Sequence, residues 1–282
     1  MASVAIAAMV FANIESQMTS VGEMVHGDHL VETLVSRSRF APFTRSRSAE
    51  RLRWLANTTL RFTPDEATEW FSHLVKAHNY LEWGSGGTTV IAAWIALDSE
   101  SPSKRQRLTV HSVEHASDFV EHLRTQNPLI LPRAEAMGSL HFHIPDIGPT
   151  GAWGRPSDWS GREPQLRLKQ AKRYVEPQGV SCCFDVILID GRFREACAMH
   201  ALRLSHKKTV VMMHDYNKPE PEPQDIRKYP RTVERWYDIL YQNTTLTVLR
   251  PKPQSLAIAT KNGEGSQMFR NALEQRETDD YM

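Results

Sequence analysis

The sequence is poor in cysteine and has no long apolar run. Its 282 residues include only Cys182, Cys183 and Cys197. Three cysteines, two of them adjacent, do not form a disulfide framework, and they lack the C-x-x-C spacing of a zinc site. We therefore expect a reducing, cytoplasmic environment. No apolar stretch approaches the ~20 residues that cross a bilayer. Residues 1–12 are apolar but have no basic residue before them, which argues against a secretory signal.

The sequence also lacks an excess of charge of either sign. Lys and Arg number 34 and Asp and Glu 33. A nearly neutral chain has no global attraction for nucleic acid or for an acidic membrane surface, so we expect neither as a partner. Residues 37–53 are rich in Ser and Arg. This pattern favours a solvated linker and helix face, with an anionic-partner patch or an active-site cap as the alternative.

The clearest local pattern is residues 80–90, YLEWGSGGTTV. It predicts the end of a buried strand, a glycine-rich turn and a helix over 87–98. Gly84 and Gly86 allow a ligand to approach the main chain, and the first N–H groups of the helix are unpaired there. A dinucleotide site needs a third glycine where Thr89 stands, and a P-loop needs a lysine. An ordinary turn without a ligand is the alternative.

Strands and helices alternate along the rest of the chain. This order predicts an α/β fold with a Rossmann-like, mostly parallel sheet and helices on both faces. The last two predicted strands have a short connection and therefore predict an antiparallel edge. Together with the strand before Gly84, the pattern gives seven strands. Helices are expected over 64–77, 116–124, 193–204 and 232–240, and the other strands over 108–115, 140–147, 184–190, 209–214, 245–249 and 255–260.

These elements divide the chain into three parts. Residues 1–60 are an N-terminal extension that is partly helical, 61–262 the main domain and 263–282 a polar tail. Thr63 and Glu66 around Pro64 match a capping box at the start of the main domain.

Two irregular segments interrupt the main domain. Residues 148–164 contain two tryptophans and predict an ordered substrate loop, with a packed tryptophan anchor as the alternative. Residues 217–231 predict a lid in which Tyr229 and Arg231 contact the substrate.

Acidic residues follow five of the predicted strands. Ligands of open parallel sheets bind beyond the carboxyl ends of the strands, where the strand order reverses. This regular placement therefore predicts one ligand site at that edge. The five are Glu82, Glu114, Asp146, Asp190 and Asp215.

The stretch from Glu82 to Gly87, EWGSGG, resembles the first motif of the class I S-adenosylmethionine-dependent methyltransferases. The resemblance implies that S-adenosylmethionine is the cofactor. It implies that Glu114 accepts hydrogen bonds from the ribose, and that Asp146 reaches the adenine, although Asp146 could equally cap the turn after it. The cofactor-binding residues implied are Glu82, Gly84, Ser85, Gly86, Glu114, His115, Asp146 and Asp190.

Two later segments, Asp190-Gly191 and His214-Asp215-Tyr216, resemble a branch of small-molecule O-methyltransferases. In parts of that branch two aspartates hold a divalent metal, and by position these are Asp190 and Asp215. Carboxylates and waters suit Mg²⁺, and Asn217 is the nearest third ligand. Without metal, Asp190, His214 or Asp215 is the expected general base.

The substrate side of the same edge has its own candidates. Arg192 and Arg194 are expected to clamp an acidic group of the substrate, with a structural ion pair as the alternative. Trp153 and Tyr216 are further expected substrate contacts. His214 follows an apolar strand and is alternatively a core histidine. His141 and His143 share one strand face, where a metal pair or a half-buried strand accounts for them.

The expected function is methyl transfer from S-adenosylmethionine to a hydroxyl of a small-molecule or sugar-like acceptor. An N-methyltransferase is less favoured, because Asp190-Gly-Arg-Phe replaces the Asn/Asp-Pro-Pro-Tyr/Phe signature. Since fold alone does not fix function, the pattern also fits a non-catalytic binding or scaffold protein with this fold. A nicotinamide-dependent oxidoreductase is disfavoured by the missing third glycine.

Overall fold

The computed structural model contains a seven-stranded sheet with the order β3-β2-β1-β4-β5-β7-β6. It describes residues 60, 62–98, 108–151, 154–157, 161–216, 232–243, 245–259, 267–268 and 271. The predicted mostly parallel sheet with an antiparallel edge is confirmed. β7 (Thr247–Pro251) runs antiparallel to β5 and to the edge strand β6 (Tyr237–Gln242). The parallel strands are β1 (Asn79–Trp83), β2 (Thr109–Val113), β3 (Leu140–His143), β4 (Phe184–Ile189) and β5 (Ser205–Met213).

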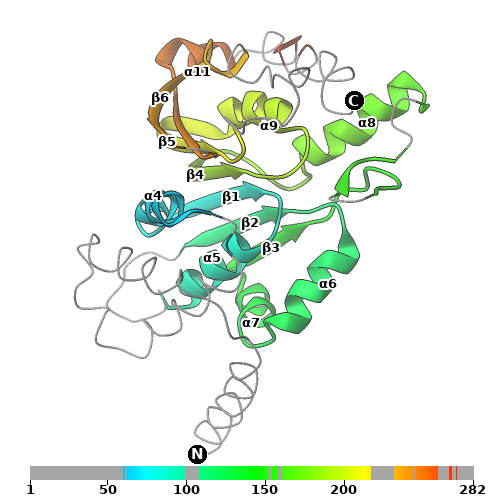
Figure 1. The fold of residues 1–282 in the computed structure, drawn as a ribbon, viewed down its shortest axis with the longest axis vertical. Coiled ribbons are helices and arrows are strands. Elements are labelled where there is room, and N and C mark those ends of the chain that lie inside the picture. Colours follow the sequence, from blue (N-terminus) through cyan, green and yellow to red (C-terminus); the bar gives the residue numbers. More distant parts are fainter. Residues whose placement is uncertain are drawn as a thin grey trace, which may run out of the picture.

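Helices cover both faces of the sheet, as predicted (Figure 1). α5 (Gly87–Asp98), α6 (Ser117–Gln126) and α7 (Leu131–Ala136) lie on one face. The other face carries α8 (Pro164–Val175), α9 (Arg194–Ala201), the short 3₁₀ helix η3 (Leu202–Leu204) and α11 (Pro253–Ala259).

The central strand β4 explains why both faces are covered. Successive side chains of a strand point to opposite faces, and Ile187 and Leu188 are both fully buried. They belong to two different apolar clusters, one on each side of the sheet. A strand buried on both faces has a continuous apolar sequence, which FDVILI nearly is.

Helix α4 (Pro64–Leu74) begins with the predicted capping box. The N–H of Glu66 donates to Thr63 Oγ1 at 3.4 Å, and the N–H of Thr63 donates to Glu66 Oε2 at 2.9 Å. The other carboxylate oxygen of Glu66 accepts from residues 245 and 246, in the turn between β6 and β7. Glu66 therefore starts the helix and also ties it to the far end of the chain.

Two predictions near the C-terminus were wrong. Residues 232–240 are not a helix: only two residues are helical before a turn and β6. Tyr237, Ile239 and Tyr241 alternate along β6, and strand-forming residues paired with β7 favour this state. Residues 255–260 were expected to be a strand, but α11 covers most of them. Pro253 opens that helix, since proline suits a first helical position.

Further elements differ in their limits or were missed. The strand expected over 140–147 ends at His143, and the one expected over 209–214 begins at Ser205. Helices α7 and α8 were not predicted, although each has a proline in its first turn. The irregular segment 148–164 does end where α8 begins.

Several expectations lie outside the described residues. These are the N-terminal extension apart from residue 60, Trp153, Trp159 and the predicted lid 217–231 with Asn217, Tyr229 and Arg231. Among the described helices, none is long and apolar enough to cross a bilayer.

Candidate functional site

Backbone hydrogen bonds continue past the ends of the strands and align the predicted site residues. The N–H of Gly84 donates to Val113 at 2.9 Å, and that of Asp190 donates to Trp83 at 2.9 Å. The N–H of Glu114 and that of His214 make the corresponding bonds to β3 and β4. The carboxyl ends of the strands therefore lie side by side, and the order reverses between β1 and β4, where ligands of such sheets bind.

At this reversal Gly84 and Gly191 lie backbone against backbone. Gly84 has a φ of +99°, and a Cβ added there would lie 2.8 Å from the Gly191 nitrogen. A Cβ on Gly191 would lie 2.9 Å from the Gly84 nitrogen and closer still to the Tyr174 hydroxyl. A Cβ on Gly86 would meet no atom within 4 Å. Gly84 and Gly191 are therefore required by the close packing of the two turns, whereas Gly86 borders open space.

The carboxylate of Glu82 is fully buried under the turn. Hydroxyls of Tyr80, Thr88 and Ser112 donate to it at 2.7–2.9 Å, and the Thr89 hydroxyl donates as well. Burial raises the pKa of this carboxyl even though the four hydrogen bonds oppose the shift. Through Thr88 and Thr89, Glu82 holds the start of α5 next to the glycine turn. Its direct contact with a cofactor stays a prediction.

Glu114 and the glycine turn are in contact. The N–H of Ser85 donates to Glu114 Oε2 at 3.3 Å, and the N–H of Ala116 donates to Oε1 at 3.0 Å. The ring of His115 is almost fully buried beside Gly154, with Nδ1 2.8 Å from Glu114 Oε1. The ends of β1 and β2 thus bring together Ser85, Gly86, Glu114 and His115.

Asp146 is exposed to solvent, unlike the buried side chains of Glu114 and His115. Its side chain is 77% exposed, and its Oδ1 accepts from the N–H of Gly148 at 2.8 Å. This is the turn contact that the sequence offered as the alternative to an adenine contact, so the adenine role has no support from this geometry.

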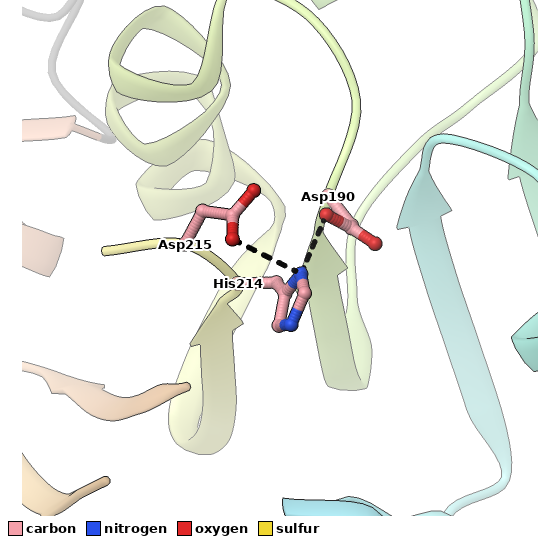
Figure 2. A group of neighbouring side chains, drawn as sticks. All are labelled: Asp190, His214 and Asp215. Carbon is pink, nitrogen blue, oxygen red and sulfur yellow. Dashed lines mark hydrogen bonds and ion pairs between the residues drawn. The ribbon is translucent and has the colours of Figure 1, made fainter. Parts of the chain in front are cut away.

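Asp190, His214 and Asp215 converge at the ends of β4 and β5 (Figure 2). His214 Nδ1 lies 3.0 Å from Asp190 Oδ1 and 3.9 Å from Asp215 Oδ1. One possible ligand atom from each residue lies within 4.8 Å of the others. Asp215 has a φ of +56°, in the left-handed region, which aspartate tolerates better than most residues. The three side chains, which the sequence places at the ends of neighbouring strands, therefore lie close together, and their catalytic role stays a prediction.

The guanidinium of Arg194 joins the two aspartates. Nη2 lies 3.1 Å from Asp190 Oδ1, and Nη1 lies 3.3 Å from Asp215 Oδ2. Arg194 is 8% exposed and is the first residue of α9. The ion-pair alternative to a substrate clamp is therefore the arrangement found for Arg194, with Asp190 and Asp215 as partners.

The other side of His214 contacts residues that the sequence did not indicate. Nε2 lies 3.1 Å from Thr245 Oγ1, which donates to Glu66 Oε1 at 2.6 Å. Burial lowers the pKa of His214, but the hydrogen bond and charge of Asp190 and the charge of Asp215 outweigh it, and the pKa is raised. Burial raises the pKa of Glu66, yet hydrogen bonds from Thr245, Thr63 and Leu246 lower it overall.

The remaining substrate candidates differ in exposure. Arg192 is partly exposed, and its guanidinium has no ion pair among the described residues; its N–H donates to the Tyr174 hydroxyl at 3.2 Å. Tyr216 is 1% exposed and belongs to the core, with its hydroxyl 3.5 Å from Glu234. Of these two, only Arg192 is accessible to a substrate in this structure.

Arg162 is a further residue that sequence analysis missed. Its guanidinium donates to the carbonyls of Ile147, Pro149 and Ser157 at 2.6–2.9 Å, and to Gln170 at 3.0 Å. These bonds join Arg162 to the main chain of the described part of segment 148–164, and its role as a substrate loop stays a prediction. A charged residue in a loop carries no sequence signal for such a role.

The histidines of β2 and β3 are not part of this edge. His111 Nδ1 lies 2.9 Å from His143 Nε2, and the His111 and His141 rings stack with centroids 4.9 Å apart. Burial first, and then the neighbouring histidines, lower the pKa of His111 to about 4. The three rings fill a partly covered sheet face. Asp190, His214 and Asp215 have possible ligand atoms within 4.8 Å of one another, and His111, His141 and His143 are not among the groups of described residues with that spacing.

Known proteins resemble this chain in structure more than in sequence. A scan against protein-family models finds no match, and no curated protein sequence matches either. A methyltransferase-like protein from Silicibacter pomeroyi has a similar crystal structure, with 26% identity and a TM-score of 0.52 over 76% of this chain and 96% of that one.

Weaker similarities include a methyltransferase from Geobacter sulfurreducens, with 13% identity and a TM-score of 0.38 over 85% of this chain and 96% of that one. An O-methyltransferase family protein from Burkholderia thailandensis has 10% identity and a TM-score of 0.37 over 78% and 64%. Similarities with scores this low do not bear on function. The strand order and the Silicibacter structure show the Rossmann-like fold of class I methyltransferases.

Proposed function

We propose that the protein transfers a methyl group from S-adenosylmethionine to a hydroxyl of a small-molecule acceptor. The observation that carries the proposal is the contact between Glu114 and the N–H of Ser85, beside the open space at Gly86. A carboxylate at the end of β2, a main chain that a ligand can approach and the N–H groups at the start of α5 are what a ribose and an amino acid group need.

The residues at the ends of β1 and β2 fit this cofactor. Gly86 leaves room that a side chain would fill, and the carboxylate of Glu114 is next to it in contact with the N–H of Ser85. His115 Nδ1 lies beside Glu114, and its buried Nε2, which is close to Gly154, has no hydrogen-bond partner among the described residues. Bound S-adenosylmethionine would supply an electrophilic methyl group, while Glu82 holds the turn in place.

Asp190 is the general base in this proposal. Its Oδ1 accepts from His214 and Arg194, and its Oδ2 has no hydrogen-bond partner among the described residues. The side chain is 31% exposed, so an acceptor can reach it. A carboxylate within hydrogen-bond distance of a hydroxyl takes its proton as the oxygen attacks. In this proposal Arg192, which is partly exposed, binds an acidic group of the acceptor.

Calorimetric titration with S-adenosylmethionine and with its demethylated product tests the cofactor. We expect saturable binding to the wild type, and Glu114→Gln to weaken it about tenfold, or about 1.4 kcal/mol. Glu121→Gln, an exposed change on α6, is the matched control and should bind as the wild type does. Absence of binding of both compounds to folded protein would overturn the proposal.

The acceptor type needs a separate measurement. Formation of the demethylated product is followed with a panel of small hydroxyl acceptors and a panel of amines. Turnover with hydroxyl compounds supports O-methylation. Turnover with amines alone supports the N-methyltransferase alternative, and cofactor binding without turnover on either panel supports a binding protein.

A further inference from the structure

Family resemblance places a divalent metal between Asp190 and Asp215, but a residue of this chain already lies between them. Arg194 Nη2 bonds to Asp190 Oδ1 and Nη1 pairs with Asp215 Oδ2, at 3.1 and 3.3 Å. The side chain is only 10% exposed. The two carboxylates that would bind the metal are thus bridged by a guanidinium.

The guanidinium is held at several points. Nε donates to the Gly191 carbonyl at 3.1 Å, Nη1 donates to the His214 carbonyl, and Nη2 donates to the Asp190 carbonyl at 3.2 Å. With the two carboxylates these make five acceptors, and a guanidinium has five N–H donors. Arg194 cannot leave without breaking bonds on both strand ends, so displacement by a metal ion is costly.

The third possible ligand is also engaged. His214 Nδ1 lies 3.0 Å from Asp190 Oδ1, and this oxygen already accepts from Arg194. A carboxylate oxygen only accepts, so Nδ1 must carry a proton to make this bond. A metal needs the lone pair of that nitrogen, because histidine ligates in its unprotonated form.

The balance of charges at the site also disfavours a divalent metal. The carboxylates of Asp190 and Asp215 carry two negative charges, and Arg194 offsets one. A divalent ion at the carboxylates would lie next to a guanidinium in a mostly buried place, where like charges repel strongly.

We propose that Arg194 is a built-in cation that takes the place of the divalent metal, so that this site binds no Mg²⁺ and acts without it. Arg194 is then a positioning residue: it fixes Asp190 Oδ1, which leaves Oδ2 directed to the acceptor. The role in catalysis depends on the proposed function, whereas the absence of metal binding does not.

Metal binding is measured with Mn²⁺ as the probe, from the spin-resonance signal of the free ion. We expect the wild type to bind none at ~1 mM. Arg194→Ala exposes the two carboxylates and should bind one Mn²⁺ at least tenfold more tightly than the wild type, which a purely structural role of Arg194 does not produce. Adding Asp190→Asn should abolish that gain.

Arg192→Ala is the matched control for metal binding. It removes the same charge two residues away but leaves the carboxylates bridged, so it should bind no Mn²⁺. Wild-type binding of Mn²⁺ that Asp190→Asn or Asp215→Asn abolishes would overturn the proposal, as would Arg194→Ala that folds and gains no affinity. If Arg194→Ala does not fold, the wild type and the two aspartate variants decide the question.

Discussion

Thr245 donates its hydroxyl to Glu66, with 2.6 Å between Oγ1 and Oε1, although 179 residues separate them. The same hydroxyl oxygen lies 3.1 Å from His214 Nε2. Because Thr245 gives its proton to Glu66, it is an acceptor for His214. The start of α4 thus contributes to the orientation of a residue at the end of β5.

Removal of the Glu66 carboxylate should destabilise the fold. Glu66→Ala leaves the donors of Thr63, Thr245 and Leu246 without their buried acceptor, and each such loss costs about 1–3 kcal/mol. We expect the free energy of unfolding in urea to fall by at least ~2 kcal/mol. Glu69→Ala on the same helix removes only a partly exposed pair with His73 and should cost well under half as much. Equal losses would contradict this role.

The glycines of the turn should respond differently to alanine. Gly84→Ala forces a Cβ against the Gly191 backbone at positive φ, and strain of this kind costs about 1–3 kcal/mol or more. Gly86→Ala meets no atom and should leave the melting temperature nearly unchanged. It should nevertheless weaken S-adenosylmethionine binding about tenfold, or about 1.4 kcal/mol. A folded Gly86→Ala protein with wild-type affinity would place the cofactor elsewhere.

Substitution of Asp190, the proposed base, should lower the rate of methyl transfer and leave the affinity for S-adenosylmethionine nearly unchanged. Asp190→Asn retains the shape but cannot take a proton, so we expect kcat to fall about 10²–10⁴-fold. S-adenosylmethionine affinity by calorimetry should change less than about threefold, which is under 1 kcal/mol. A small rate effect would move the base to another residue.

The fold should lose stability in acid through His111. Its pKa is about 4 in the fold and 6.5 in the unfolded chain, so the unfolded chain binds the extra proton between these values. Stability should therefore fall as the pH drops from 6.5 toward 4. His111→Phe keeps the ring stacking, and urea midpoints at several pH values should show a weaker acid loss. An unchanged pH slope would show that His111 does not titrate in this way.

His214 should show the opposite pH dependence. Its folded pKa is raised above 6.5, so its stabilising charge is fully present below 6.5 and is lost as the pH rises through the folded value. The difference in free energy of unfolding between wild type and His214→Gln should thus be larger below pH 6.5 than well above it. A difference that grows with pH would contradict the raised pKa.

The strand ends were predictable because the chemistry there is local in sequence. Glu114 and Asp190 directly follow the apolar strands β2 and β4, Asp215 follows β5 after His214, and parallel strands end at one edge. An ion pair of Arg194 was predicted only as an alternative, and its bridge between two aspartates was not predicted, because sequence gives no direction for a side chain. The contact between Thr245 and Glu66 could not be predicted, since nothing in the sequence relates two positions so far apart.

Strand and helix assignments failed where tertiary pairing decides. The sequence of β6, YDILYQ, alternates as a strand, yet its preceding residues suit a helix, and the pairing with β7 selects the strand. The start of α11 at Pro253 was a usable local signal. Two misassigned segments left the number of strands correct.

The strand order has a consequence for the order of synthesis. β1, β2 and β3 leave the ribosome before β4, yet β4 pairs with β1 in the centre of the sheet. Until β4 emerges, β1 is an unpaired edge, which is prone to wrong pairing. The glycine turn is made early, but its closing partner at Gly191 arrives late. A nascent chain therefore completes the proposed cofactor site only at the moment when the two halves of the sheet join.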